Sequence, residues 1–400
     1  MRSRLPFIFI IITVMLDAMG IGLIMPVMPD LIREIHGDTI SAASLWGGVL
    51  AFTYSIMQFA CAPLLGNLSD AYGRRVVLLT SLVVMGLDYF LMAVAGSLWL
   101  LVLARALSGA TGATYSTAAA FLADLSKPEE RAANFGLIGA AFGLGFIMGP
   151  AIGGLLGEFG TRAPFIAAGA LALINAAFGW FAVPESLSEA NKRKFQWSRA
   201  NPFNALLRLR EMPAVGGLVG VMFVYTIANY VYPVIWSFFA IERFGWSKAT
   251  VGLSLAYYGL LAALVQGWLI RPILRRLGER KTAIAGFLLS ALGMVVLSVV
   301  AEGYLVFLLM PITALGVIVT PALQGMSANR VPDSEQGELQ GVISSVNGIA
   351  MIISPLLMAG LFREFTREGA TIYLPGAPFL LAAVLTLVSL AMLLRIRRLG

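Results

Sequence analysis

Residues 66–75 read Gly-Asn-Leu-Ser-Asp-Ala-Tyr-Gly-Arg-Arg, and this short polar stretch separates two long apolar runs, 42–65 and 76–95. Each run has about the 20 residues that a helix needs to cross the hydrocarbon layer of a membrane. The two glycines permit tight turns, and the charged side chains suit a connector in water. The stretch therefore predicts a helical hairpin whose connector lies at a membrane surface.

Apolar runs of this length recur along the whole chain. Of its 400 residues, 59% are hydrophobic and 12% charged, against about 45–50% and about 25% in soluble domains. A water-soluble globule of this size cannot hide so much apolar surface, so we expect an all-α integral membrane protein. Twelve transmembrane helices are expected near 6–29, 42–65, 76–95, 98–123, 133–157, 163–184, 212–240, 248–270, 282–301, 303–327, 338–361 and 373–395.

A long polar stretch divides these runs into two sets of six. We expect an N-terminal six-helix bundle at 1–184, a cytoplasmic linker at 185–211 and a C-terminal six-helix bundle at 212–400.

An internal repeat indicates that the two bundles are pseudo-symmetric copies. At an offset of 205, Pro150 matches Pro355 and Gly73 matches Gly278. Parallel repeats that rock about a central site are typical of alternating-access carriers.

The distribution of lysine and arginine predicts the orientation. If the N-terminus is cytoplasmic, that side collects 21 basic residues and the other side 6, while Arg105 falls inside a span. Such a bias is expected of cytoplasmic connectors. Both termini are therefore expected in the cytoplasm, which requires an even number of spans.

Several function classes lack the residues they need. With only Cys61 and His36, the chain has no intramolecular disulfide, no histidine-based metal site and no His-containing triad. A G-x-x-x-x-G-K-[ST] loop for nucleotide phosphates is also absent from the sequence. We expect no enzyme activity, no cofactor, no metal and, despite the net charge of +7, no nucleic-acid partner.

The stretch 66–75 resembles the G-x-L-x-D-x-x-G-R-R loop of the major facilitator superfamily, between spans two and three. The resemblance implies the major facilitator fold and a gating loop formed by Gly66, Asp70, Gly73, Arg74 and Arg75. Asp70 could receive a helix N-terminus or an arginine and so hold one face closed. Alternatively, the two arginines only anchor the positive side.

Span five carries Gly145, Gly149, Pro150, Gly153 and Gly154. This pattern resembles the Gly-Pro motif of the superfamily's antiporters. Small residues let helices approach closely, and a proline permits a bend. Close packing alone is the alternative interpretation.

Four further segments, 16–27, 87–89, 142–145 and 321–325, resemble the bacterial tetracycline/proton antiporters. The similarity runs from span one to span twelve and implies the drug/proton antiporter branch. It departs at two positions: Ala262 and Ser290 stand where that family has a histidine and an aspartate that contribute to coupling.

Ionisable residues inside a span are candidates for function because burying a charge is costly. Asp17, Asp88 and Arg105 lie deep in the predicted spans of the first half. Asp88 and Arg105 lie about 12 Å below the same turn and could pair, directly or through water. We interpret Asp17 as the leading proton-binding residue, with Arg105 modulating its proton affinity. Asp88 would share the proton, fix Arg105 or form a static ion pair.

Span seven carries an aromatic stripe with one amide, interrupted by Pro233, on one helix face. Such a stripe suits a lipophilic, ring-containing solute, although helix packing or an interfacial belt gives the same pattern. The candidate substrate-cavity residues are Gln58, Tyr225, Asn229, Tyr232, Trp236, Tyr257, Tyr258, Gln324 and Asn347.

Together these features predict a multi-pass secondary transporter of the bacterial cytoplasmic membrane. It would be a monomer in the lipid bilayer that exports lipophilic small molecules or drugs, tetracycline-like ones included, in exchange for protons. The proton gradient would drive it. Uptake of a metabolite is the alternative among transporters, and a non-transporting receptor or an intramembrane enzyme is the alternative from other classes.

Overall fold

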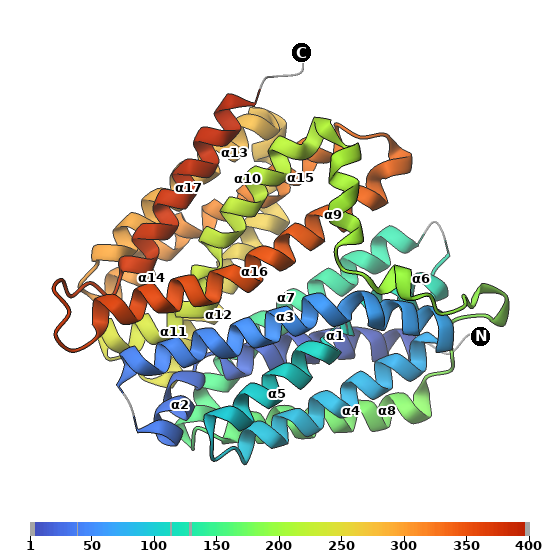
Figure 1. Ribbon diagram of the computed structural model, residues 1–400, viewed down its shortest axis with the longest axis horizontal. Coiled ribbons are helices and arrows are strands. Elements are labelled where there is room, and N and C mark those ends of the chain that lie inside the picture. The colour runs from blue at the N-terminus through green and yellow to red at the C-terminus, as the bar shows by residue number, and fades with distance from the viewer. Residues whose placement is uncertain (1–4, 38, 113, 128–129, 397–400) are drawn as a thin grey trace. The chain divides into compact units, whose positions relative to one another are not determined.

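The computed structural model describes residues 5–37, 39–112, 114–127 and 130–396. Within these residues every regular element is a helix (Figure 1). Ten helical segments there are long and apolar enough to cross a membrane. The terminal tails 1–4 and 397–400, whose arginines enter the orientation count, lie outside the described residues.

Contacts divide the chain into two compact units. The first comprises Met1–Gly37, Thr53–Pro202 and Ser247–Ala256, and the second comprises Asp38–Phe52, Phe203–Trp246 and Tyr257–Gly400. The early helices are α1 (Leu5–Ile24), α2 (Met28–His36), α3 (Ile40–Tyr72), α4 (Arg74–Ala93), α5 (Leu98–Thr111), α6 (Thr114–Leu125), α7 (Arg131–Glu158) and α8 (Ala163–Ala182). The later helices are α9 (Asn204–Arg208), α10 (Pro213–Asn229), α11 (Val231–Phe244), α12 (Lys248–Leu264), α13 (Ile270–Val299), α14 (Gly303–Ala314), α15 (Val319–Ala328), α16 (Gln336–Thr366) and α17 (Ala377–Arg395).

Helix starts repeat at the offset that the sequence indicates. The helices α5, α6 and α7 begin 205 residues before α14, α15 and α16. Each unit also has a buried core built from corresponding helices. One core joins α1, α4, α6, α7 and α8, and the other joins α10, α13, α15, α16 and α17.

Some expected spans are broken where the sequence disfavours a regular helix. The expected helix at 98–123 ends after Thr111 and resumes at Thr114, in a glycine-containing stretch where helix propensity is low. The expected span at 212–240 is interrupted at Tyr230. Pro233 explains this break because its ring clashes with the carbonyl group four residues earlier and it donates no backbone hydrogen bond.

Two glycines turn the chain sharply at equivalent places in the repeat. Gly73, between α3 and α4, has φ 111°, and Gly278, inside α13, has φ 72° and ψ 167°. Residues with a Cβ rarely adopt positive φ. Gly278 therefore divides the long apolar stretch Lys248–Val299 into two helical parts.

Helix α7 packs on α1 through glycines four residues apart. A Cβ added at Gly145, Gly149 or Gly153 would meet the α1 backbone, at the carbonyl groups of Met15, Met19 and Leu23. Glycine at this spacing brings two helix backbones into direct contact. This contact places α1, and with it Asp17, in the core of the first unit.

A leucine at Gly149 should destabilise the first unit, since its Cβ would lie 2.5 Å from the Met19 carbonyl oxygen. We expect Gly149→Leu to cost about 1–3 kcal/mol, as overpacked cores do. Gly143→Leu is the matched control because open space surrounds Gly143 on the same helix. Thermal unfolding in detergent should show a lower Tm for Gly149→Leu alone, and equal Tm values would contradict this packing.

Candidate proton-coupling and solute sites

A small polar cavity lies among the helices of the first unit. Its lining includes Asp17 from α1, Tyr54 from α3, Tyr89 from α4, and Arg105 and Ser108 from α5. Its volume of about 20 Å³ is room for about one water molecule. The cavity can hydrate the charged groups, but it is too small for a drug-sized ligand.

Asp88 is held beside this cavity by a neutral partner. Its side chain is 2% exposed, and one carboxylate oxygen accepts a hydrogen bond from the Ser108 hydroxyl. The other oxygen has no hydrogen-bond partner among the described residues. Leaving a buried polar atom unpaired is costly, so Asp88 retains one unsatisfied acceptor.

Arg105 stacks on an aromatic ring. Its guanidinium carbon lies 4.4 Å from the centroid of the Tyr54 ring, a geometry in which the ring face attracts the cation. The Gln58 amide in turn donates to the Tyr54 hydroxyl at 3.2 Å and to the Gly112 carbonyl at 3.0 Å. This chain of contacts fixes the ring that supports the arginine.

The structure thus brings two of the three predicted coupling residues, Asp17 and Arg105, into one cavity lining. Asp88 is linked to that lining through Ser108. Within the described parts of the chain, no ion pair joins Asp88 to Arg105. Sequence reasoning missed Tyr54 and Ser108, because neutral side chains in a span give no signal comparable to a buried charge.

The predicted gating loop is organised around Arg74. This side chain forms an ion pair with Asp70, lies 3.5 Å from an Asp124 oxygen and donates to the Ser69 hydroxyl at 3.1 Å. An arginine bridging two carboxylates ties the end of α3 to the end of α6. The sequence prediction did not include Asp124.

Glu185 holds the start of α4 from the other side. Its carboxylate accepts from the backbone N–H of Arg74 at 2.8 Å and of Arg75 at 3.2 Å. It also accepts from the N–H groups of Ser186 and Leu187, each at 3.0 Å. A carboxylate at a helix N-terminus satisfies donors that the helix itself leaves open. Glu185 is the first residue of the expected linker, and nothing in its local sequence predicted this contact.

Removing this carboxylate should loosen the loop. We expect Glu185→Ala to cost about 1 kcal/mol locally, as the loss of a helix cap does, so amide hydrogen exchange at residues 74 and 75 should be several-fold faster. Glu189→Ala serves as the control, since Glu189 is 86% exposed and pairs with Lys192. Unchanged exchange in Glu185→Ala would show that the cap does not stabilise the loop.

In the second unit, Tyr225, the first of the predicted solute residues there, belongs to a hydrogen-bond network of neutral groups. The Tyr225 hydroxyl lies 3.2 Å from the Ser290 hydroxyl and donates to the Gly316 carbonyl at 3.3 Å. Ser290 is buried. Ser290, one of the two positions at which the sequence departs from the family it resembles, is therefore a neutral, hydrogen-bonded group.

Beyond the break at Tyr230, the aromatic side chains of the predicted span-seven stripe pack against other aromatic rings. The Tyr232 ring stacks on the Tyr258 ring with centroids 5.9 Å apart, and Tyr232 and Trp236 both contact the Phe379 ring. Trp236 is buried, whereas Tyr232 and Tyr258 are half-buried. The two tyrosines thus retain exposed surface for a ligand, and Trp236 mainly supports them.

The remaining candidates are spread over four helices. Asn347 accepts a hydrogen bond from Thr226 at 2.9 Å, and the Tyr257 ring lies 6.1 Å from the Phe307 ring. Asn229, at the end of α10, and Gln324, on α15, are half-buried. Gln58 belongs to the first unit and the other eight candidates belong to the second.

Comparison with known proteins places this architecture in a family. A sequence model of the Major Facilitator Superfamily matches residues 10–273 and again 217–399. The chain belongs to the major facilitator superfamily. The chain and a crystal structure of the nucleoside transporter NupG share this superfamily's fold, with a TM-score of 0.81 at 14% identity over 98% of this chain and 100% of that one.

Relatives within the superfamily are more specific. The chain is 41% identical to "Tetracycline resistance protein, class C" of Escherichia coli over 95% of this chain and 97% of that protein. It is 40% identical to the class G protein of Vibrio anguillarum over 93% and 96%. These matches confirm the predicted resemblance to that branch, and with it a proton-coupled efflux transporter that crosses the cell membrane several times.

Proposed function

We propose that this major facilitator exports a tetracycline-like small molecule in exchange for protons that bind in the first unit. The observation that carries the proposal is the small cavity, lined by both Asp17 and Arg105, within apolar helices. A half-buried carboxylate in an apolar span has little use in packing. The relatives named for tetracycline resistance supply the class of solute.

In the proposed cycle, Asp17 is the proton carrier. Among the described residues it forms no hydrogen bond or ion pair with a side chain, so a proton can reach and leave its carboxylate through water in the cavity. Arg105, held over Tyr54, stabilises the ionised carboxylate when it approaches, and its withdrawal removes that stabilisation and favours proton binding. Asp88, bonded to Ser108, positions the α5 segment that carries Arg105.

The second unit is proposed to contact the solute. Tyr232 and Tyr258 present stacked rings on which a fused-ring molecule can lie. Tyr225, Ser290 and Asn347 offer neutral hydrogen-bonding groups. With Ala262 and Ser290 in place of the family's histidine and aspartate, proton binding relies on the first unit.

Asp17→Asn should abolish proton-driven transport while leaving solute binding in place. We expect an imposed pH gradient to drive tetracycline flux in proteoliposomes of the unmodified protein, and at least about 100-fold less in the variant, as expected when a proton-transferring group is lost. Glu368→Gln is the control because this carboxylate is exposed outside the helices.

Solute exchange without a pH gradient tests the proposed proton carrier, Asp17, separately from the proposed solute. Asp17→Asn should still exchange labelled for unlabelled tetracycline, because no net proton movement is needed. Full gradient-driven flux in Asp17→Asn would remove this residue from the mechanism. Absence of tetracycline flux in the unmodified protein would instead overturn the proposed solute.

The proposed topology is twelve spans in two six-helix bundles with both termini in the cytoplasm. Ten segments qualify by length and composition. The stretch Lys248–Val299 supplies one more because Gly278 divides it, and α5 with α6 supplies the other. The repeat at an offset of 205 supports bundles joined by the 185–211 linker.

Labelling of introduced cysteines tests this orientation. In a Cys61→Ser background, we expect Glu368→Cys to react with a membrane-impermeant maleimide in intact cells. Glu189→Cys should react only after the membrane is opened. In the proposed topology an odd number of spans separates residues 189 and 368, so the two cysteines lie on opposite sides of the membrane. Equal reactivity of the two cysteines in intact cells would contradict this topology.

A further inference from the structure

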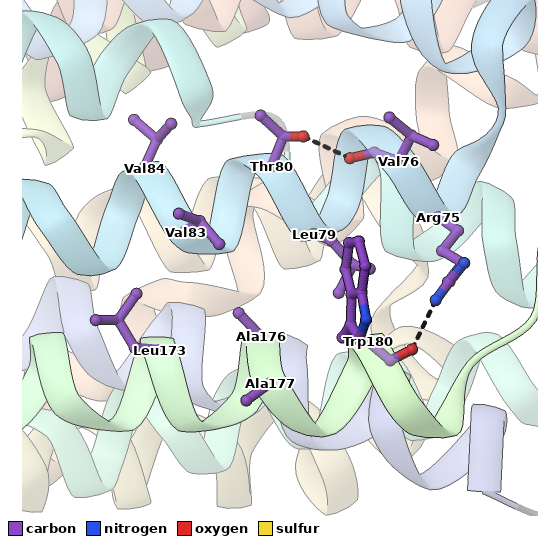
Figure 2. Close-up of a pocket in the computed structure, with 10 residues that line it drawn as sticks. All are labelled: Arg75, Val76, Leu79, Thr80, Val83, Val84, Leu173, Ala176, Ala177 and Trp180. Atoms are coloured by element: carbon purple, nitrogen blue, oxygen red, sulfur yellow. Dashed lines mark hydrogen bonds between the residues drawn. The ribbon is translucent and has the colours of Figure 1, made fainter.

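An open apolar groove runs between α4 and α8 on the surface of the first unit. Its volume is about 560 Å³, within the range of small-molecule sites. The walls are Val76, Leu79, Thr80, Val83 and Val84 from α4, and Leu173, Ala176, Ala177 and Trp180 from α8, with Arg75 at one end. Figure 2 shows the two helices side by side, with Arg75 and Trp180 together at the same end.

The surface of α4 and α8 around the groove is apolar. Val76 is 55% exposed and Trp180 is 64% exposed, and neighbouring exposed side chains on the two helices include Leu87, Ile174 and Phe181. In a protein that spans a membrane, such a surface is covered by lipid. The length of the groove fits one leaflet, because the nine steps from Arg75 to Val84 cover about 14 Å and half of the hydrocarbon core is about 15 Å.

The polar end of the groove carries a cation, Arg75, that has no acidic partner among the residues that the structure describes. The Arg75 guanidinium donates to the Trp180 carbonyl at 2.6 Å and lies 5.5 Å from the centroid of the Trp180 ring. Its Nε is buried without a hydrogen-bond partner in the part of the chain that the structure describes. The nearby Glu185 carboxylate is instead bound to four backbone N–H groups.

We propose that this groove binds one acyl chain of an anionic membrane phospholipid, whose phosphate lies against the Arg75 guanidinium. Arginine presents several fixed donors to phosphate oxygens. Tryptophan is enriched at the depth of lipid headgroups, where the Trp180 indole lies beside the charge. The apolar walls below match a hydrocarbon chain, and the Thr80 hydroxyl among them already donates to the Val76 carbonyl at 2.8 Å.

This inference goes beyond drug transport and does not depend on the solute. It links the lipid to the gating loop through one residue: Arg75 follows Arg74, which is paired with Asp70 and Asp124. A bound phosphate would hold the start of α4 through Arg75 in addition to the Glu185 cap. The lipid composition of the membrane would then influence the gating loop.

Native mass spectrometry of the full chain in detergent tests the site. The probes are palmitoyl-oleoyl phosphatidylglycerol, phosphatidylethanolamine with the same chains, and the matching diacylglycerol, which lacks the phosphate. We expect tightest binding of phosphatidylglycerol. Arg75→Gln should bind it about five-fold more weakly, the effect of one basic residue at an anionic membrane surface, and Arg75→Lys should restore part of the loss.

Filling the groove gives a second test if Arg75→Gln does not fold. We expect Ala177→Trp to reduce phosphatidylglycerol binding by displacing the acyl chain. Ile174→Trp is its control, since Ile174 is exposed on the same helix but does not line the groove. Equal binding by all variants, or diacylglycerol or phosphatidylethanolamine binding as tightly as phosphatidylglycerol, would overturn the proposal.

Discussion

The absence of water from the hydrocarbon layer governs this structure. Backbone groups there must bond within helices, and a charged side chain must find a partner or a pocket of water. The first unit satisfies this constraint with neutral groups: a serine hydroxyl for Asp88 and an aromatic face for Arg105. Such partners hold a charge in place without cancelling it. The positive charge of Arg105 therefore stays available to Asp17 in the proposed proton cycle.

Close helix contact makes that arrangement possible. The glycines of α7 place its backbone against α1, so the helix that carries Asp17 is fixed along its length. At Gly20, one turn beyond Asp17, the same helix meets the Tyr89 hydroxyl of α4. The glycine pattern first associated with antiporters thus has a direct packing role here. Packing and coupling are compatible interpretations, because the close contact with α7 fixes the position of Asp17, the proposed proton-binding residue.

The all-helical membrane fold was predictable from the sequence, since long apolar runs and an internal repeat are properties of the linear chain. The breaks at Thr111 and Tyr230 were less so, because the effects of glycine and proline depend on tertiary context. Charges inside apolar runs made Asp17, Asp88 and Arg105 candidates, whereas the neutral Ser108 and Tyr54 beside them could not be found in this way. Asp124 and Glu185 lie outside the quoted loop motif, and only folding brings them to Arg74 and to the start of α4.

The hydrogen bonds among Tyr225, Ser290 and Gly316 have a consequence for how such proteins diversify. Every member of that network is electrically neutral and already has a partner. Exchanging a neighbouring aromatic or amide side chain would reshape the proposed solute surface without adding or deleting an ionisable group. Selectivity could then drift among descendants of this chain while the number of protons moved per cycle stayed the same.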